Sequence, residues 1–153
     1  IDVCDKQMWL RRPSFTWVKM IRTEKARELK IHFPKGLTRQ DIPVHWNLVT
    51  QLDKVSVLPE RLFYYRQQPN ATTAKKDKRL FDLAYVMDIT KEFLIEKNLY
   101  AQYKDEFLRQ RLNLLSGMYD SITKNLKKEA LTLITERLGH DETEYINSNN
   151  DCL

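Results

Sequence analysis

Glycine and proline are scarce in this chain, and their scarcity argues against folds built from tight turns. The 153 residues include only three Gly and five Pro, which favours helices over strand hairpins. No apolar stretch approaches the roughly 20 residues that a transmembrane helix needs. The length is in the one-domain range and allows a core that folds without metals or many disulfides. We expect one domain, 1–153, with terminal segments at 1–13 and 140–153.

Motifs for catalysis and for metal binding are also missing. The three histidines are scattered (His32, His45 and His140), and no HExxH, CxxC or paired His/Cys spacing is present. No phosphate-binding glycine loop and no GxSxG motif occurs. Neighbours in the pairs Asp105/Glu106 and Asp141/Glu142 point about 100° apart on a helix, which favours solvated surface over a catalytic pair. The sequence thus predicts a binding protein with no catalytic residue, metal or cofactor.

Apolar residues recur at helical spacing in five segments, which predicts an all-α bundle of about five helices. The predicted helices cover about 14–32, 41–59, 77–98, 99–117 and 120–139. Ser14 and Asp41 are expected to cap the first two, and Pro59 to kink or divide the second. Asp120 or Ser121 is expected to cap the last, and Gly139 to end it. The polar run 67–78 is predicted to be a loop.

The two cysteines and one sequence triplet indicate an extracellular protein. Cys4 and Cys152 lie at opposite ends of the chain, and because the termini of a domain often lie close together, a disulfide between them is expected. Two free thiols are the alternative. This disulfide is also the feature expected to hold the acidic tail 140–153. Asn70-Ala71-Thr72 matches an N-glycosylation acceptor, a triplet that also occurs often by chance. A first residue other than Met is consistent with signal-peptide removal or with a trimmed chain, and we expect secretion.

Positive charge is concentrated in the first half. Through Arg79 there are 17 Lys or Arg against 8 Asp or Glu, and from Leu80 onward 9 against 13. This imbalance indicates an anionic partner: lipid, nucleic acid, acidic glycan or acidic protein. An ordinary solvated face is the alternative. The candidate binding residues form two clusters, Arg11, Arg12, Lys19, Arg22 and Lys30 around the first predicted helix and Lys75, Lys76, Lys78 and Arg79 at the third. Trp9 and Trp17, near the first cluster, are either interfacial anchors or core.

The segment Arg79-Leu80-Phe81-Asp82-Leu83-Ala84-Tyr85 resembles a segment of the sperm lysins of marine gastropods, with Asp, Ala and Tyr at the same spacing. Further landmarks follow the same order along the chain: Val18-Lys19, His45-Trp46, Phe93-Leu94, Lys97-Asn98-Leu99 and Tyr103. The similarity runs from about Trp17 to Leu112. The sequence departs from the lysin pattern in four ways. Pro43 and Pro59 interrupt what is one long helix in lysin, and about four residues, roughly one helical turn, look inserted near 89–92. The C-terminal region is also longer, and the net charge is less basic.

The resemblance implies a secreted, non-enzymatic sperm protein of the acrosomal vesicle that acts at the egg surface. The mass of 18.4 kDa and the departures from lysin favour an acrosomal paralogue within the family, associated with fusion of sperm and egg membranes. Its expected partners are the egg membrane surface, including anionic lipid, or an egg-coat glycoprotein. Lysin-like dissolution of the egg vitelline envelope is one alternative, and a secreted helical cytokine is another. A nucleic-acid-binding module would also explain the basic half, but no nucleic acid is expected as a partner.

Overall fold

The protein is all-α, as the sequence predicts. The computed structural model describes residues 5–66 and 76–149, and these contain seven α-helices, three short 3₁₀ turns and no strand. The α-helices are α1 (Lys6–Leu10), α2 (Thr23–Glu28), α3 (Asp41–Gln51), α4 (Asp82–Glu96), α5 (Tyr100–Ser121), α6 (Lys127–Thr135) and α7 (His140–Ser148). The 3₁₀ turns are η1 (Thr16–Val18), η3 (Lys78–Phe81) and η4 (Lys124–Leu126). None of the described helices is both long and apolar enough to cross a membrane.

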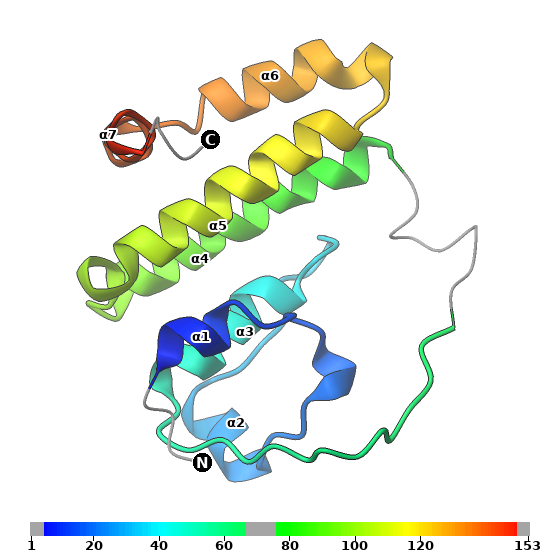
Figure 1. Ribbon diagram of the computed structural model, residues 1–153, viewed down its shortest axis with the longest axis vertical. Coiled ribbons are helices and arrows are strands. Elements are labelled where there is room, and N and C mark those ends of the chain that lie inside the picture. The colour runs from blue at the N-terminus through cyan, green and yellow to red at the C-terminus, as the bar shows by residue number, and fades with distance from the viewer. Residues whose placement is uncertain (1–4, 67–75, 150–153) are drawn as a thin grey trace.

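The antiparallel pair α4 and α5 forms the centre of the molecule. Helices α1 and α3 pack on one side of this pair, and α6 and α7 lie along the other (Figure 1). Trp46 of α3 and Phe107 of α5 are fully buried and meet edge to face, with ring centroids 5.9 Å apart. Such aromatic pairs contribute about 0.5–1.5 kcal/mol beyond the area they bury. The core therefore joins α3 directly to the central pair.

The break between α4 and α5 falls where the sequence predicts it. Asn98 adopts a left-handed backbone with φ of +56°. The N–H of Leu99 donates to the carbonyl of Leu94 at 2.8 Å, and that of Asn98 to Ile95 at 3.0 Å, which is the hydrogen-bond pattern of a Schellman cap. Asn tolerates this backbone better than most residues, so it ends α4 locally.

The prediction of one helix over 14–32 is wrong. The chain forms only η1 and the six-residue α2, with extended backbone between them. The cap is wrong too, because the Ser14 hydroxyl donates to the Asp41 carboxylate at 3.2 Å. Short helices depend on burying an apolar face, and Trp17, Val18 and Met20 lie exposed with no core to receive them. Helical spacing was present here, but a packing partner was not.

The second predicted helix is shorter than expected. Helix α3 starts after Gln40 and stops at Gln51, with Asp41 as its first residue rather than its cap. Leu52 is already extended, and described residues 53–66 form no helix. This part of the chain includes Pro59, which cannot donate a helical hydrogen bond, and its side chains are largely exposed.

The C-terminal part differs most from the prediction. Helix α5 continues through Gly117, so the next helix, α6, begins only at Lys127, after η4. Gly139 does not end α6 but precedes α7, and its N–H donates to the Glu142 carboxylate at 3.1 Å. The tail is a helix through Ser148, and it is joined to α4 and α5 by the ion pairs of Asp141 and Glu142.

Two carboxylates predicted to be solvated are buried instead. Glu142 is fully buried and pairs with Lys91 at 3.1 Å and with Arg111, itself 2% exposed, at 3.3 Å. Glu106 is nearly buried and pairs with Arg11 and Arg109. Burial opposes ionisation of both carboxylates, but the hydrogen bonds and cations around them hold each pKa below its ordinary value. Buried charges occur where partners meet them. Lys91, Arg111 and Arg11 come from outside the helix of the carboxylate they pair with, whereas Arg109 lies on α5 together with Glu106.

Cys4, Cys152 and the glycosylation candidate Asn70 lie outside the described residues. The disulfide stays a prediction: the mature protein should show no alkylated cysteine when it is denatured without reductant, and two after reduction. Intact mass spectrometry measures this directly. Two alkylated thiols in unreduced protein would contradict the pairing.

Candidate functional site: an aromatic surface bordered by arginines

Three aromatic side chains from two distant segments stack at the surface. Trp17 of η1 lies between Phe15 and Tyr65, with ring centroids 4.5 Å and 5.4 Å away and nearly parallel planes. All three are exposed, Trp17 at 49%. Large rings are usually buried, so an exposed stack of them indicates an interaction site. We call Phe15, Trp17 and Tyr65 the ring stack.

The ring stack is held by a turn that the Lys19 side chain closes. The Lys19 ammonium donates to the carbonyls of Pro13 at 2.9 Å and Phe15 at 2.8 Å. The Lys19 side chain thus supplies the hydrogen bonds that these two backbone carbonyls would otherwise form within a helix. Burial lowers the pKa of Lys19, and the nearby Asp41 carboxylate partly opposes this. Lys19 therefore has a positioning role, in addition to the charge for which the sequence singled it out.

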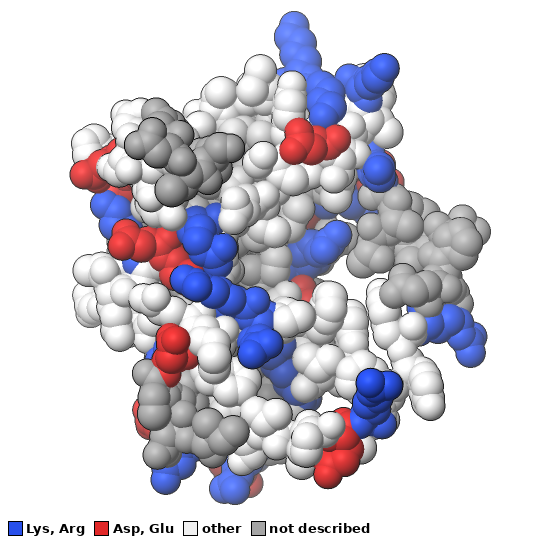
Figure 2. Space-filling view, in the orientation of Figure 1, with Lys and Arg blue, Asp and Glu red and all other residues white. Residues whose placement is uncertain are grey.

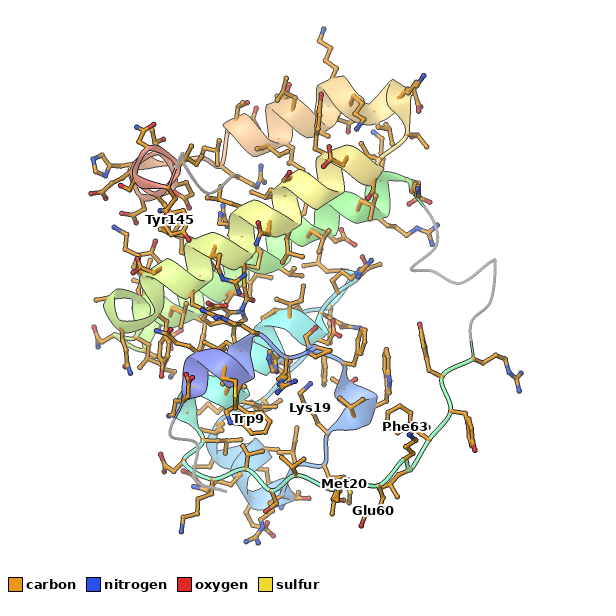
Figure 3. All side chains as sticks on the ribbon, viewed as in Figure 1. Trp9, Lys19, Met20, Glu60, Phe63 and Tyr145 are labelled. Carbon is orange, nitrogen blue, oxygen red and sulfur yellow. The ribbon has the colours of Figure 1, made fainter. Side chains whose placement is uncertain are left out.

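Further apolar side chains extend the surface. The segment 57–65 lies opposite η1, and Phe63 points toward it while Met20 projects from the chain nearby (Figure 3). Met20 is 96% exposed, and Tyr64 is fully exposed. The other exposed apolar residues of this segment are Val57, Leu58 and Leu62. Exposed apolar residues this frequent within one short stretch of chain indicate a candidate interaction surface.

Exposed arginines lie next to both segments of this surface in the chain. Arg12 and Arg22 flank η1 in the chain, and Arg61 and Arg66 flank the Tyr65 segment; all four are exposed and have no ion pair among the described residues. Glu60 is the acidic residue within 57–66. The surface thus combines apolar rings with unneutralised positive charge.

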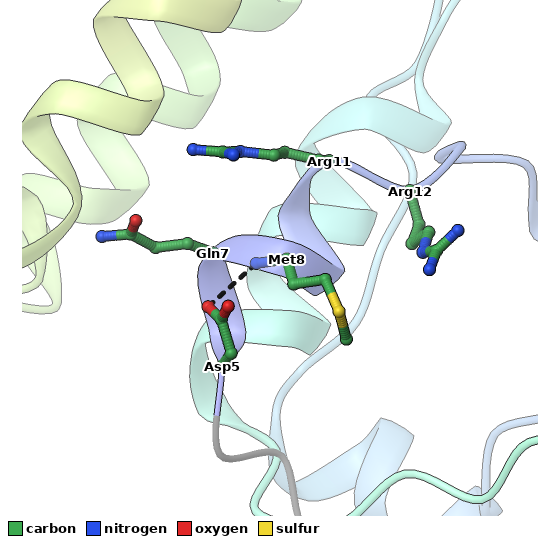
Figure 4. Close-up of a pocket in the computed structure, with 5 residues that line it drawn as sticks. All are labelled: Asp5, Gln7, Met8, Arg11 and Arg12. Atoms are coloured by element: carbon green, nitrogen blue, oxygen red, sulfur yellow. Dashed lines mark hydrogen bonds between the residues drawn. The ribbon is translucent and has the colours of Figure 1, made fainter.

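A shallow hollow of about 280 Å³ lies beside α1, between the ring-stack turn and α5 (Figure 4). It is lined by Asp5, Gln7, Met8, Arg11 and Arg12. The Asp5 carboxylate is engaged by the Met8 N–H at 3.0 Å, and Arg11 by Glu106 at 3.0 Å. Arg12 is therefore the free cation of this hollow among the described residues, placed to meet an anionic group near the ring stack.

The structure divides the candidate residues chosen from sequence. Arg12, Lys19 and Arg22 lie close in the chain to Phe15 and Trp17 of the ring stack, whereas η3, with Lys78 and Arg79, lies at the other end of the molecule, where Lys78 pairs with Glu129 of α6 (Figure 1). Lys76 lies at that end too, and Lys75 is outside the described residues. Lys30, with φ of +50°, follows the end of α2.

Two of the residues chosen from the sequence, Arg11 and Trp9, contact other parts of the protein. Arg11 pairs with the buried Glu106, so it holds α1 on α5. Trp9 is partly buried against the core (Figure 3), and its carbonyl lies 3.1 Å from His45 Nε2. Trp17, by contrast, is 49% exposed.

Sequence reasoning did not select Tyr65 or the exposed segment before it. The run Leu62-Phe63-Tyr64-Tyr65 follows Pro59 with no helical partner downstream, and that was the available signal. Its contact with Trp17 joins residues far apart in the chain and has no local signature.

One group of possible metal ligands occurs in the described part of the chain. His140, Asp141 and Glu144 have ligand atoms within 4.8 Å of one another. The Lys104 ammonium, however, pairs with Asp141 at 2.8 Å and Glu144 at 3.4 Å, which satisfies these carboxylates without an ion.

Comparison with known proteins identifies no relative: no family model, curated protein or solved structure matches this chain. The residues that resemble sperm lysins include Trp46, Leu83, Ala84 and Tyr103, which are buried in the core. The resemblance therefore bears on packing more than on a binding surface. The class that fold and site define is an all-α protein with an exposed aromatic, arginine-bordered surface.

Proposed function

We propose that this protein binds anionic membrane surfaces through the ring stack and its bordering arginines, as a secreted, non-enzymatic fertilization protein of the sperm acrosome that promotes sperm–egg membrane fusion. The observation that carries the membrane step is the exposed stack of Phe15, Trp17 and Tyr65, in chain segments that also contain the exposed residues Arg12, Arg22, Arg61 and Arg66. The biological setting rests on the lysin-like landmarks of the sequence.

The magnitudes explain why both kinds of side chain are needed. Each arginine near an anionic surface contributes about 1 kcal/mol, so four of them supply about 4 kcal/mol, equivalent to millimolar affinity. Burying one large apolar side chain adds roughly 1.5–3 kcal/mol. Insertion of the ring stack at the headgroup boundary therefore decides whether binding is useful at micromolar protein concentration.

We expect the protein to bind phosphatidylserine-containing vesicles at low salt and to leave phosphatidylcholine vesicles largely unbound. Trp17→Ser should weaken binding about tenfold because a large ring no longer inserts. Vesicle co-flotation measures this, and lipid mixing measures fusion. Rising salt should weaken binding by screening the arginines.

Leu131→Ser is the matched control for this test. Leu131, at 51% exposure, is about as exposed as Trp17 but lies on α6. It should leave vesicle binding unchanged. If the wild-type protein neither binds nor mixes anionic vesicles at low salt, the membrane proposal fails, and egg-envelope or receptor binding should replace it.

The sperm setting is tested separately by locating the protein in its source animal. Antibody staining should place it in the acrosomal vesicle. Expression confined to somatic tissue, with saturable receptor binding there, would contradict the fertilization role and favour a cytokine.

A further inference from the structure

Two lysine-rich segments that are far apart in the sequence lie together at the end of the molecule where η3 and η4 begin. The Thr123 N–H donates to the Lys76 carbonyl at 3.3 Å, and the Lys78 ammonium pairs with Glu129 of α6 at 2.8 Å. Six cations therefore gather there, and we call them the lysine end: Lys76, Lys78, Arg79, Lys124, Lys127 and Lys128. Basic side chains are prominent along the upper edge of the molecule, over α6 (Figure 2).

Half of these cations are free. Those with internal partners are Lys78 with Glu129, Arg79 with Asp77, and Lys127 with the Tyr119 carbonyl. Lys76, Lys124 and Lys128 are exposed and have no hydrogen bond or ion pair from their side chains within the described residues. They come from the chain before η3, from η4 and from the first turn of α6.

The position of these charges does not favour the fold. Lys78 lies in the first turn that leads into α4, while Lys124 and Lys128 lie at the start of η4 and α6. Cations at a helix N-terminus oppose the helix dipole. The pairs with Glu129 and Asp77 neutralise only part of this charge, so the free lysines at the two helix starts favour an anion bound from outside.

We infer that the lysine end is a second binding surface, for an acidic polysaccharide with repeated sulfate or carboxylate groups. The free side chains are lysines, which are hydrated point charges that suit a flexible chain of separated anions better than one planar ligand. The ring of Tyr119 lies under the Lys127 ammonium, 4.2 Å away, and is not presented for insertion as the ring stack is. This inference does not depend on the proposed membrane function.

The test uses heparin as a sulfated probe and the full chain, with affinity measured by titration at several salt concentrations. Lys124→Glu/Lys128→Glu should bind heparin about tenfold more weakly than wild type, because the free cations beside the bound anions are reversed. The matched control is Lys35→Glu/Lys54→Glu, which changes net charge equally at exposed residues of the other half. It should bind heparin nearly as wild type does.

In the heparin titrations, three outcomes would overturn the inference: equal loss in both double variants, no loss in either, or tighter binding of plain duplex DNA than of heparin. Vesicle binding by Lys124→Glu/Lys128→Glu should stay near wild type. An equal loss there would show that the lysine end contacts lipid instead. Unaltered melting temperatures identify folded variants, and a failure of the Trp17 test would leave the heparin result standing.

Discussion

Glu142→Leu is expected to lower the free energy of unfolding by about 3–5 kcal/mol, because removing one partner of a buried ion pair leaves the other charge uncompensated. Glu142 is fully buried between Lys91 and Arg111, and Arg111 is only 2% exposed. The variant leaves Arg111 with Asp88, 2.7 Å away, as its remaining carboxylate. It also removes the acceptor for the Gly139 N–H at the start of α7. Urea denaturation with an unchanged m-value measures the loss.

Glu144→Leu is the control on the same helix. Glu144 is 59% exposed and pairs with Lys104 at 3.4 Å, so its removal should cost less than about 1 kcal/mol, the usual range for a surface pair. If Glu142→Leu stays within 1 kcal/mol of wild type, Glu142 does not anchor α7 as the geometry indicates. In that case the amide hydrogens of α7 should exchange no faster in Glu142→Leu than in the wild-type protein.

Stability is also expected to fall by about 3 kcal/mol between pH 6.5 and pH 4 because of His45. His45 is 4% exposed in α3, and its Nε2 lies 3.1 Å from the Trp9 carbonyl, so Nε2 carries the proton and donates. Burial, and next the Lys19 ammonium, lower the pKa of His45 to about 4, and the carbonyls of Trp9 and Leu10 and the Asp41 carboxylate offset this only in part.

The sign follows from which state takes up the proton first. Below pH 6.5 the unfolded chain protonates at this histidine, while the folded protein does not until about pH 4. The stabilisation is therefore complete above pH 6.5 and is lost as the pH falls through this window. The carboxylates Glu106 and Glu142, whose pKa values lie below the ordinary 4.5, add their own loss only below that pH.

His45→Gln isolates this contribution. The glutamine amide can still donate to the Trp9 carbonyl but does not titrate. Urea midpoints measured from pH 7.5 to 4.5 should fall steeply for wild type and stay nearly flat for the variant. Parallel curves for the two proteins would assign the pH dependence to other groups.

The sequence by itself determined the features that depend on neighbours in the chain. The apolar spacing of α4 and α5 reflects the pitch of each helix, and Asn98 ends α4 through its own backbone. Local signals also named Arg12, Trp17 and Arg22 of the candidate site. These features survive because helix formation and capping involve residues only three to five positions apart.

Only the tertiary structure decided which apolar and charged residues are buried. The 14–32 segment has helical spacing but nothing to pack against, so Trp17 lies in an exposed stack with Tyr65 instead of in a core. Glu142 looked like a solvated surface residue until Lys91 and Arg111 from other helices met it. Whether a side chain is buried depends on which distant segments pack against it. The contribution of a ring or a carboxylate to stability therefore depends on this environment more than on its neighbours in sequence.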